Sequence, residues 1–282
     1  MIPAGADPHH YEPNELKLVN SLREASLVVM SGPSHLIIEK KIKELKSRGI
    51  IKVRIIDYSD YAETGLKLLK NPRTGQINPH GYFFSISGIK AIAITVAKVL
   101  AEIDPEGAEY YNNRLKSFLK ILDEINSSAH RIIKNLNVKV VLFSPVTQYI
   151  INDLGFEIRD VMLLEYDVEL SEDDLNRIFN LFEKESNLIL VLTDRDVARF
   201  SKLLDILTAK GVKYTVAPIF KNVKKPEYSV LLVASSIYSA YYESIKKGET
   251  GKLSLLLNAS LITNFVLAFL LILIFYRLRG EF

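Results

Sequence analysis

The stretch LVVMSGPSHLIIEKKIKELKSRGIIKVRII, residues 27–56, decides the fold class. Leu27 to Met30 form a short apolar run closed by Ser-Gly-Pro, which predicts a buried strand. Residues 36–48 carry apolar side chains at helical spacing, and Gly49 is a typical helix stop. Residues 50–56 then alternate between apolar and polar side chains, as strands do. A strand, a helix and a strand in this order predict a parallel sheet, so the expected fold class is α/β.

The second half of the chain repeats this alternation. Strands are expected at 138–143, 188–192 and 212–216, and helices at 148–154, 171–184 and 200–210. A chain of 282 residues is long enough for two α/β lobes of ordinary size. We therefore expect an N-terminal lobe at residues 1–104 and a C-terminal lobe at residues 137–245.

A long helix is expected between the two lobes. Asp104, Pro105 and Glu106 have the form of a helix start, with a cap, a proline at the first helical position and an acid in the first turn. From there to about Leu136 the apolar side chains keep helical spacing. Such a helix would be about 45 Å long, which is more than one lobe needs. We predict that residues 105–136 form a spine that joins the lobes.

Composition excludes several classes of protein. The chain has 36 Lys and Arg against 33 Asp and Glu, a net charge of +3 and no basic block, which argues against a nucleic-acid partner. It has no cysteine, so disulfides, thiolate zinc sites and cysteine nucleophiles are excluded. Phosphate-loop, serine-hydrolase and zinc-protease motifs are absent. Asp194 and Asp196 could be paired carboxylates, but the acidic first turn of a helix explains them. An enzyme is not expected.

The C-terminal segment is strongly apolar. Residues 253–276 contain no charged side chain. As a helix they would reach about 36 Å, which exceeds the roughly 30 Å of a bilayer's hydrocarbon core. We predict a transmembrane helix at 253–276, after a linker at 246–252 and before a short tail at 277–282. Arg277 and Arg279 favour a cytoplasmic C-terminus, which would leave the lobes outside the cytoplasm.

Two histidines lie in loops that could present them to a ligand. His9 lies in GADPHHYEP, residues 5–13, and His80 lies in NPHGY, residues 78–82. Each follows a proline directly before a helical region, and such loops carry ligand-binding groups in α/β lobes. Neutral imidazole is the commonest nitrogen ligand of zinc. His9 and His80 are therefore candidate metal ligands, with surface loop histidines as the alternative. His35 and His130 are interpreted as surface or packing residues.

Three segments resemble signatures of a known family. They are residues 5–13, the pair Pro79-His80, and AEIDPEGAEYY at 101–111, and they resemble the zinc/manganese solute-binding proteins of ABC importers over about residues 3–245. The resemblance implies two lobes that face each other across a cleft, joined by one long helix. It implies first-lobe ligands at His9 and His80, with His10 as a weaker candidate. It also implies zinc or manganese as the transported ion and a metal ABC permease as partner.

The second lobe departs from the family pattern. Where the family places a His or Glu ligand after the first strand of this lobe, the chain has Pro145, which has no side-chain donor atom. Where the family places an Asp after a late strand, the sequence near 219–224 has Lys221, which repels a cation. The resemblance therefore implies an incomplete metal site and weak binding. Glu165, in an acidic loop, is a candidate substitute carboxylate, unless that loop is simply solvated.

The start of the chain also departs from the family pattern. The family begins with a signal sequence, a strand and a helix before the segment at which this chain starts, and neither a basic start nor an apolar run follows Met1. We expect the true start to lie upstream. The leading interpretation is an extracytoplasmic, membrane-anchored receptor of a metal importer. The alternatives are a membrane-tethered interaction protein that has lost the metal and a cytoplasmic tail-anchored adaptor.

Overall fold

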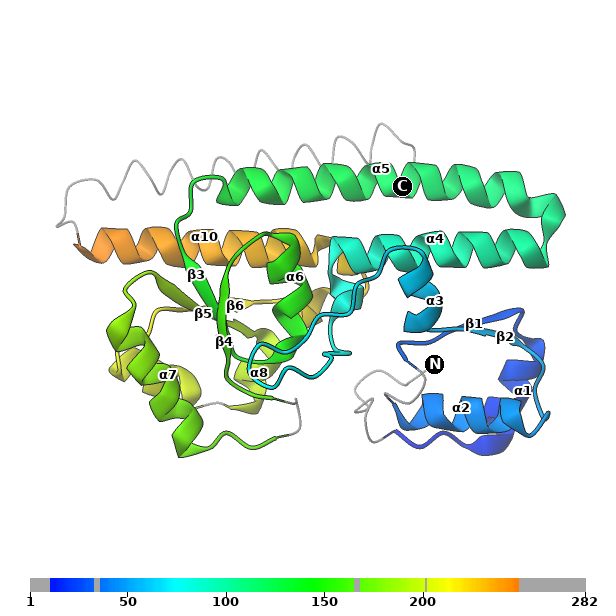
Figure 1. Cartoon of the computed structure of the whole chain (residues 1–282), viewed down its shortest axis with the longest axis horizontal. Coiled ribbons are helices and arrows are strands. Elements are labelled where there is room, and N and C mark those ends of the chain that lie inside the picture. Colours follow the sequence, from blue (N-terminus) through cyan, green and yellow to red (C-terminus); the bar gives the residue numbers. More distant parts are fainter. Residues whose placement is uncertain (1–10, 33–35, 165–167, 201, 249–282) are drawn as a thin grey trace. The chain divides into compact units, whose positions relative to one another are not determined.

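The computed structural model of the chain describes residues 11–32, 36–164, 168–200 and 202–248 (Figure 1). The chain divides into two units, Met1–Ala240 and Tyr241–Phe282. The first unit contains the strands of both α/β lobes. The second unit begins inside the last described helix, α10 (Ser229–Gly248).

The N-terminal lobe contains a two-stranded parallel sheet made by β1 (Leu27–Val29) and β2 (Arg54–Ile56). Helices α1 (Glu15–Glu24) and α2 (Ile37–Ser47) pack on it through an apolar cluster that includes Leu22, Met30 and Leu45. Helix α3 (Tyr58–Glu63) follows β2 and is capped by Asp57, whose side chain accepts a hydrogen bond from the amide of Ser59. The parallel pairing predicted from residues 27–56 is confirmed.

The burial predicted for the first strand is wrong in part. Leu27 and Val28 are half-buried and Val29 is 50% exposed, whereas Met30, just after the strand, is buried. The apolar run therefore identifies a strand, but β1 pairs with β2 alone among the described residues. A strand with a single neighbour leaves part of its surface open to water.

The C-terminal lobe contains a four-stranded parallel sheet with the order β4-β3-β5-β6. Its strands are β3 (Lys139–Leu142), β4 (Ile158–Val161), β5 (Leu188–Thr193) and β6 (Tyr214–Ala217). Its helices are α6 (Gln148–Asp153), α7 (Glu172–Lys184), α8 (Asp194–Arg199) and α9 (Leu203–Ala209). All six residues of β5 are buried, because neighbouring strands flank it and helices cover the sheet. The parallel sheet predicted for this lobe is confirmed.

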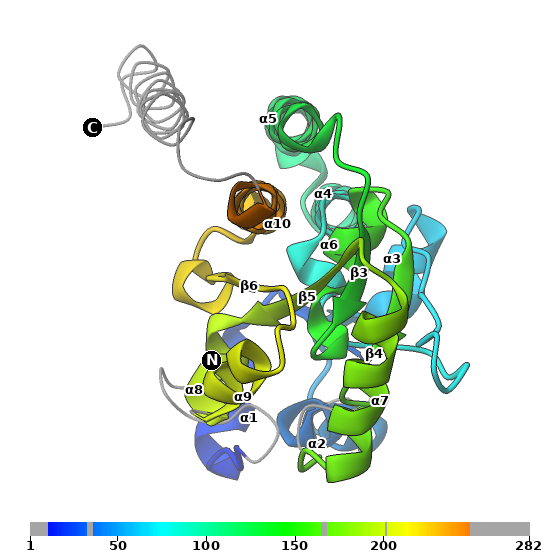
Figure 2. The ribbon, with the colours of Figure 1, turned by 90° about the vertical axis from the view of Figure 1, so that its left-hand side faces the viewer.

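Two long helices lie between the lobes in sequence. Helix α4 (Ile86–Ile103) and helix α5 (Ala108–Ile133) pack side by side, joined by a 3₁₀ turn that begins at Asp104 and Pro105 (Figures 1 and 2). The predicted helix start at Asp104-Pro105 is confirmed. Helix α4 also contacts α6 of the second lobe. The division into a spine at 105–136 and lobes on either side stays a prediction.

The predicted fold class needs one correction. It included a transmembrane helix at residues 253–276, but in the part of the chain that the structure describes no helix is long and apolar enough to cross a membrane. The long described helices carry charged or polar side chains along their length, as α5 does with its exposed lysines and acids. Residues 253–276 themselves lie outside the described residues. The fold class is therefore two α/β lobes with parallel sheets.

Candidate functional site

The second sheet has one point at which the order of its strands reverses. From β3 the chain continues to β4 on one side, whereas β5 pairs with the opposite side of β3. In open parallel sheets, ligands bind at the carboxyl ends of the strands at such a point. Pro145 follows β3 and Asp194 follows β5, so these two turns border the expected binding position.

The loop that carries His80 rests on the turn after β3. Gly81 has a φ of 81°, and a Cβ atom at this position would lie 1.8 Å from the carbonyl oxygen of Val146. Only glycine combines this backbone conformation with so close an approach. Gly81 therefore allows the His80 loop to touch the backbone beside Pro145.

Asn78 holds this loop in place. Its side chain is 3% exposed, and its Nδ2 donates to the carbonyl oxygen of Pro145 at 2.9 Å and to Oε1 of Gln148 at 2.8 Å. Its Oδ1 accepts from the amide of His80 at 2.9 Å. One buried amide thus joins His80 to Pro145, two residues that the sequence placed in different lobes.

The remaining predicted site residues divide into two groups. His80 is half-buried, and its loop lies against the turn that contains the buried Pro145. His9, His10 and Glu165 lie outside the described residues, and their roles stay predictions. Within the described ranges, no group of three or more His, Asp or Glu side chains could hold a metal ion.

The carboxyl ends of β5 and β6 are tied together by Asp194. Its carboxylate accepts from the amide of Phe220 at 3.0 Å and from the amide of Lys221 at 2.8 Å. The ring of Phe220 packs edge-on against Phe84 at 5.5 Å between centroids, and the guanidinium of Arg195 lies 5.4 Å from the Phe220 centroid. The loop after β6, which carries Lys221, therefore contacts the 3₁₀ helix η1 (Tyr82–Phe84) that follows His80.

A buried acid lies beneath the turn after β3. Asp196 is 1% exposed, and its Oδ2 accepts from the amide and hydroxyl of Thr193 and from the hydroxyl of Ser144. Burial raises the pKa of the Asp196 carboxyl to about 6, although these hydrogen bonds act against the rise. The sequence pattern Thr-Asp-Arg-Asp predicted the helix start, which is confirmed, but it carried no sign of the burial or of the bond to Ser144.

Comparisons with known proteins identify the family of the chain. A family model described as zinc-uptake complex component A, periplasmic, matches residues 1–251. The manganese ABC transporter substrate-binding lipoprotein PsaA of Streptococcus mitis is 27% identical over 135 residues, which are 46% of this chain and 42% of that protein. The chain thus matches less than half the length of this relative.

Solved structures share the fold. The solute-binding protein FpvC of Pseudomonas aeruginosa, in complex with Ni²⁺, has a TM-score of 0.67 and 19% identity, covering 89% of each chain. A zinc-bound ZnuA deletion mutant has a TM-score of 0.66 and 23% identity, covering 85% of this chain and 87% of the other. At these identities the likeness concerns the fold.

Proposed function

Because the chain belongs to the family of the periplasmic component A of zinc-uptake complexes, we propose that it captures a divalent metal ion outside the cytoplasm and delivers it to an ABC permease. A manganese importer's substrate-binding lipoprotein is among its relatives, and the folds of Ni²⁺- and zinc-bound proteins resemble its own. The proposed cargo is a divalent transition metal, and zinc and manganese are the first ions to test.

The position of His80 is the observation that carries this proposal. Its loop is fixed by Asn78 and Gly81 at the strand-order reversal of the second sheet, where α/β proteins bind ligands. A half-buried imidazole held there is a suitable nitrogen ligand for zinc. His9, from the other Pro-His motif, is the second proposed ligand.

We further propose that the site is incomplete and that it prefers zinc. Pro145 brings no side-chain donor atom to the turn after β3, and Lys221 brings a positive charge to the loop after β6. A site with fewer protein ligands leaves the ion more open to water and weakens binding. Nitrogen ligands bind zinc more tightly than manganese in the usual affinity order.

Calorimetric titration of the full chain with zinc and with manganese tests the proposal. His80→Ala and His9→Ala should each weaken zinc binding by about tenfold or more, because each removes one of few ligands. His130→Ala is the matched control, because His130 is exposed on α5 and its ring nitrogen contacts the carbonyl oxygen of Asn126. Zinc binding that is unchanged by His80→Ala would place the site elsewhere.

A second candidate function is an interaction protein of the same fold that no longer binds metal. Pro145 supports it, because this buried residue occupies the turn at which a second-lobe ligand is expected. Absence of zinc and manganese binding by the wild-type chain, with the fold intact by circular dichroism, would favour this function over the first.

A further inference from the structure

Residues 69–78 form a short finger that leads directly to His80. Lys70 and Ile77 pair as an antiparallel bridge. The amide of Asn71 donates to the carbonyl oxygen of Gln76 at 2.8 Å, and the amide of Asn78 donates to the carbonyl oxygen of Leu69 at 2.8 Å. The finger belongs to the predicted first lobe by sequence, but among the described residues its hydrogen bonds to other elements go to the second lobe.

The base of the finger is held by helix α6. The hydroxyl of Tyr149 accepts from the amide of Leu69 at 3.0 Å and donates to the carbonyl oxygen of Asn78 at 2.5 Å. Nε2 of Gln148 donates to the carbonyl oxygen of Lys70 at 2.7 Å. Both ends of the finger are therefore attached to one short helix of the second lobe.

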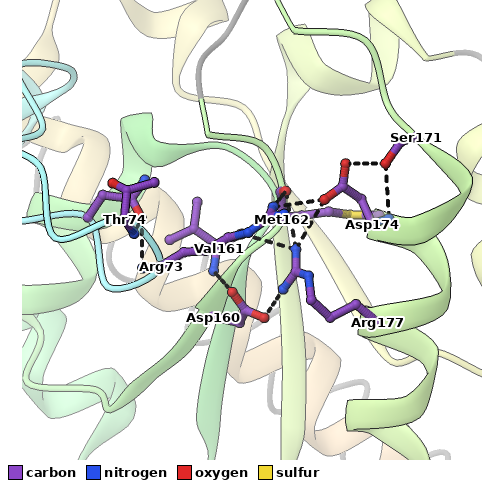
Figure 3. A network of polar contacts seen from close by, with 9 residues as sticks. Arg73, Thr74, Asp160, Val161, Met162, Ser171, Asp174 and Arg177 are labelled. Carbon is purple, nitrogen blue, oxygen red and sulfur yellow. Dashed lines mark hydrogen bonds and ion pairs between the residues drawn. The ribbon is translucent and has the colours of Figure 1, made fainter.

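The tip of the finger is held by Arg73 (Figure 3). Nη1 of Arg73 donates to the carbonyl oxygen of Met162 at 2.9 Å and to Oδ1 of Asp174 at 2.8 Å. Met162 follows β4 directly, and Asp174 lies in the first turn of α7. Among hydrogen bonds between described residues, those that join residues 72–77 to the second lobe come from Arg73.

Asp174, the acceptor of this ion pair, is buried and has a further hydrogen-bond partner. Asp174 is 9% exposed, and it also accepts from the hydroxyl of Ser171 at 2.6 Å. Burial acts to raise the pKa of the Asp174 carboxyl, but the hydrogen bonds from Ser171 and Arg73 outweigh it and lower that pKa below its usual value. The carboxylate is therefore charged at neutral pH, and its bonds to Arg73 are charge-assisted.

The guanidinium of Arg177 also lies near Asp174, so removal of Arg73 would not leave the Asp174 carboxylate without a cationic partner. Arg177 bonds Asp160 and also reaches Oδ1 of Asp174 and the carbonyl oxygen of Met162, both at 3.4 Å (Figure 3). Without Arg73, Asp174 would keep both Arg177 and Ser171 as partners. Substitution of Arg73 should therefore release the finger tip while the second lobe stays folded.

We propose that Arg73 is a positioning residue for His80, an inference that rests on the proposed function. A finger attached only at its base can pivot about α6. A second attachment, to the end of β4 and the start of α7, removes that freedom. Arg73 at the tip and Asn78 at the base together fix the position, relative to Pro145, of the segment that leads to His80.

Three variants of the full chain test this role: Arg73→Ala, Arg73→Lys and the control Arg159→Ala. Arg159 lies on β4 and pairs with Glu157 and Glu185, so its removal breaks an ion pair of the second lobe that does not involve the finger. A lysine at position 73 can reach one acceptor but lacks the planar fork of arginine, so it should restore only part of the effect.

The first two measurements need no metal. Hydrogen exchange of the Asn71, Gly75 and Asn78 amides should become about tenfold faster in Arg73→Ala and stay unchanged in Arg159→Ala. The ring resonances of His80, assigned with His80→Ala, should shift in Arg73→Ala and not in the control. Unchanged exchange rates of the finger amides, together with unchanged His80 resonances, would overturn the proposal.

Zinc titration supplies the third measurement. Arg73→Ala should weaken zinc binding by about three- to tenfold, with Arg73→Lys between it and the wild type. Faster exchange with unchanged His80 resonances and unchanged zinc affinity would show a purely structural residue and overturn the positioning role. If the wild-type chain bound no zinc, the proposed function would fail, and the His80 resonances would still decide whether Arg73 positions that ring.

Discussion

The two parallel sheets of this chain differ sharply in burial. Each residue of β5 is buried, whereas Ile56 is the one buried residue of β1 and β2 together. Strand β5 lies between β3 and β6, while β1 and β2 have only each other among the described residues. Buried apolar surface contributes about 25 cal/mol per Å². The second sheet therefore stabilises the chain far more than the first.

This difference explains why the candidate site is built on the second lobe. His80, Asn78 and Arg73 precede the spine in sequence, but their loop is attached to α6, β4 and α7. A well-packed sheet holds such attachments in fixed positions, which a site requires. The first sheet contributes through fewer ties, of which the bond from Tyr82 to Ser31 is one.

The largest expected effect comes from Asp196, the buried acid of helix α8 in the second lobe. The pKa of Asp196 is about 6 in the folded chain, and that of an unfolded Asp is about 3.9. Because the folded state favours the protonated form, this group lowers the free energy of unfolding as pH rises from about 4 to about 6. The loss should reach about 3 kcal/mol and stay constant above that range.

Urea unfolding between pH 4 and 7 measures this effect. The difference in unfolding free energy between the wild type and Asp196→Asn should change across the range, because the variant has no titrating group at this position. Curves that stay parallel would mean that Asp196 is ionised in the folded chain. Burial of Asp196 would then not raise the pKa of its carboxyl.

The next prediction compares the loss of stability when a valine is replaced in each of the two sheets. Val191 in β5 is 1% exposed and Val29 in β1 is 50% exposed. Val191→Ala should lower the free energy of unfolding by about 2 kcal/mol, from lost burial and a new cavity. Val29→Ala should lower it by less than about 0.5 kcal/mol. Urea unfolding measures both losses from the shift of the midpoint, provided that the dependence on urea concentration is unchanged. Equal losses in the two variants would contradict the difference in burial between the sheets.

The sequence predicted the local features of the fold well. The apolar run at 188–192 is the strand Leu188–Thr193, and Asp104 is a helix cap as expected. Such features depend on neighbours in sequence. The burial of Leu27 to Val29 was predicted wrongly because it depends on which other strands pair with β1. The transmembrane helix was predicted from an apolar segment that lies outside the described residues.

The candidate site was predictable only in part, for the same reason. The Pro-His motifs are visible in the sequence, and the prediction that Pro145 replaces a ligand depends on the resemblance to the family and stays a prediction. The partners of the finger are not, because Arg73 and Asp174 are 101 positions apart, and Asn78 and Pro145 are 67 apart. No periodicity relates such pairs. An asparagine before Pro-His and an arginine after Asn-Pro give no local sign of the residues that they will contact.

The third expected effect is smaller than those at Asp196 and Val191, and it concerns the hydrogen bond between the first sheet and the His80 loop. The hydroxyl of Tyr82 donates to the carbonyl oxygen of Ser31, just after β1, at 2.6 Å, and Tyr82 is 1% exposed. Tyr82→Phe keeps the ring and removes this bond, which should lower the free energy of unfolding by about 1 kcal/mol. Ser31 is half-buried, so water can reach part of the freed carbonyl.

The local consequence is more informative than the global one. In Tyr82→Phe, hydrogen exchange should become several-fold faster at the amide of Met30, which bonds the carbonyl oxygen of Ile56, and stay unchanged in β5. Tyr111→Phe is the control, because it removes an exposed bond to Asp104 at the α4–α5 turn, remote in sequence from either sheet. Equal acceleration in both sheets would show that they open as one cooperative unit. Acceleration confined to the first sheet would show that the weaker sheet can open while the second sheet stays closed.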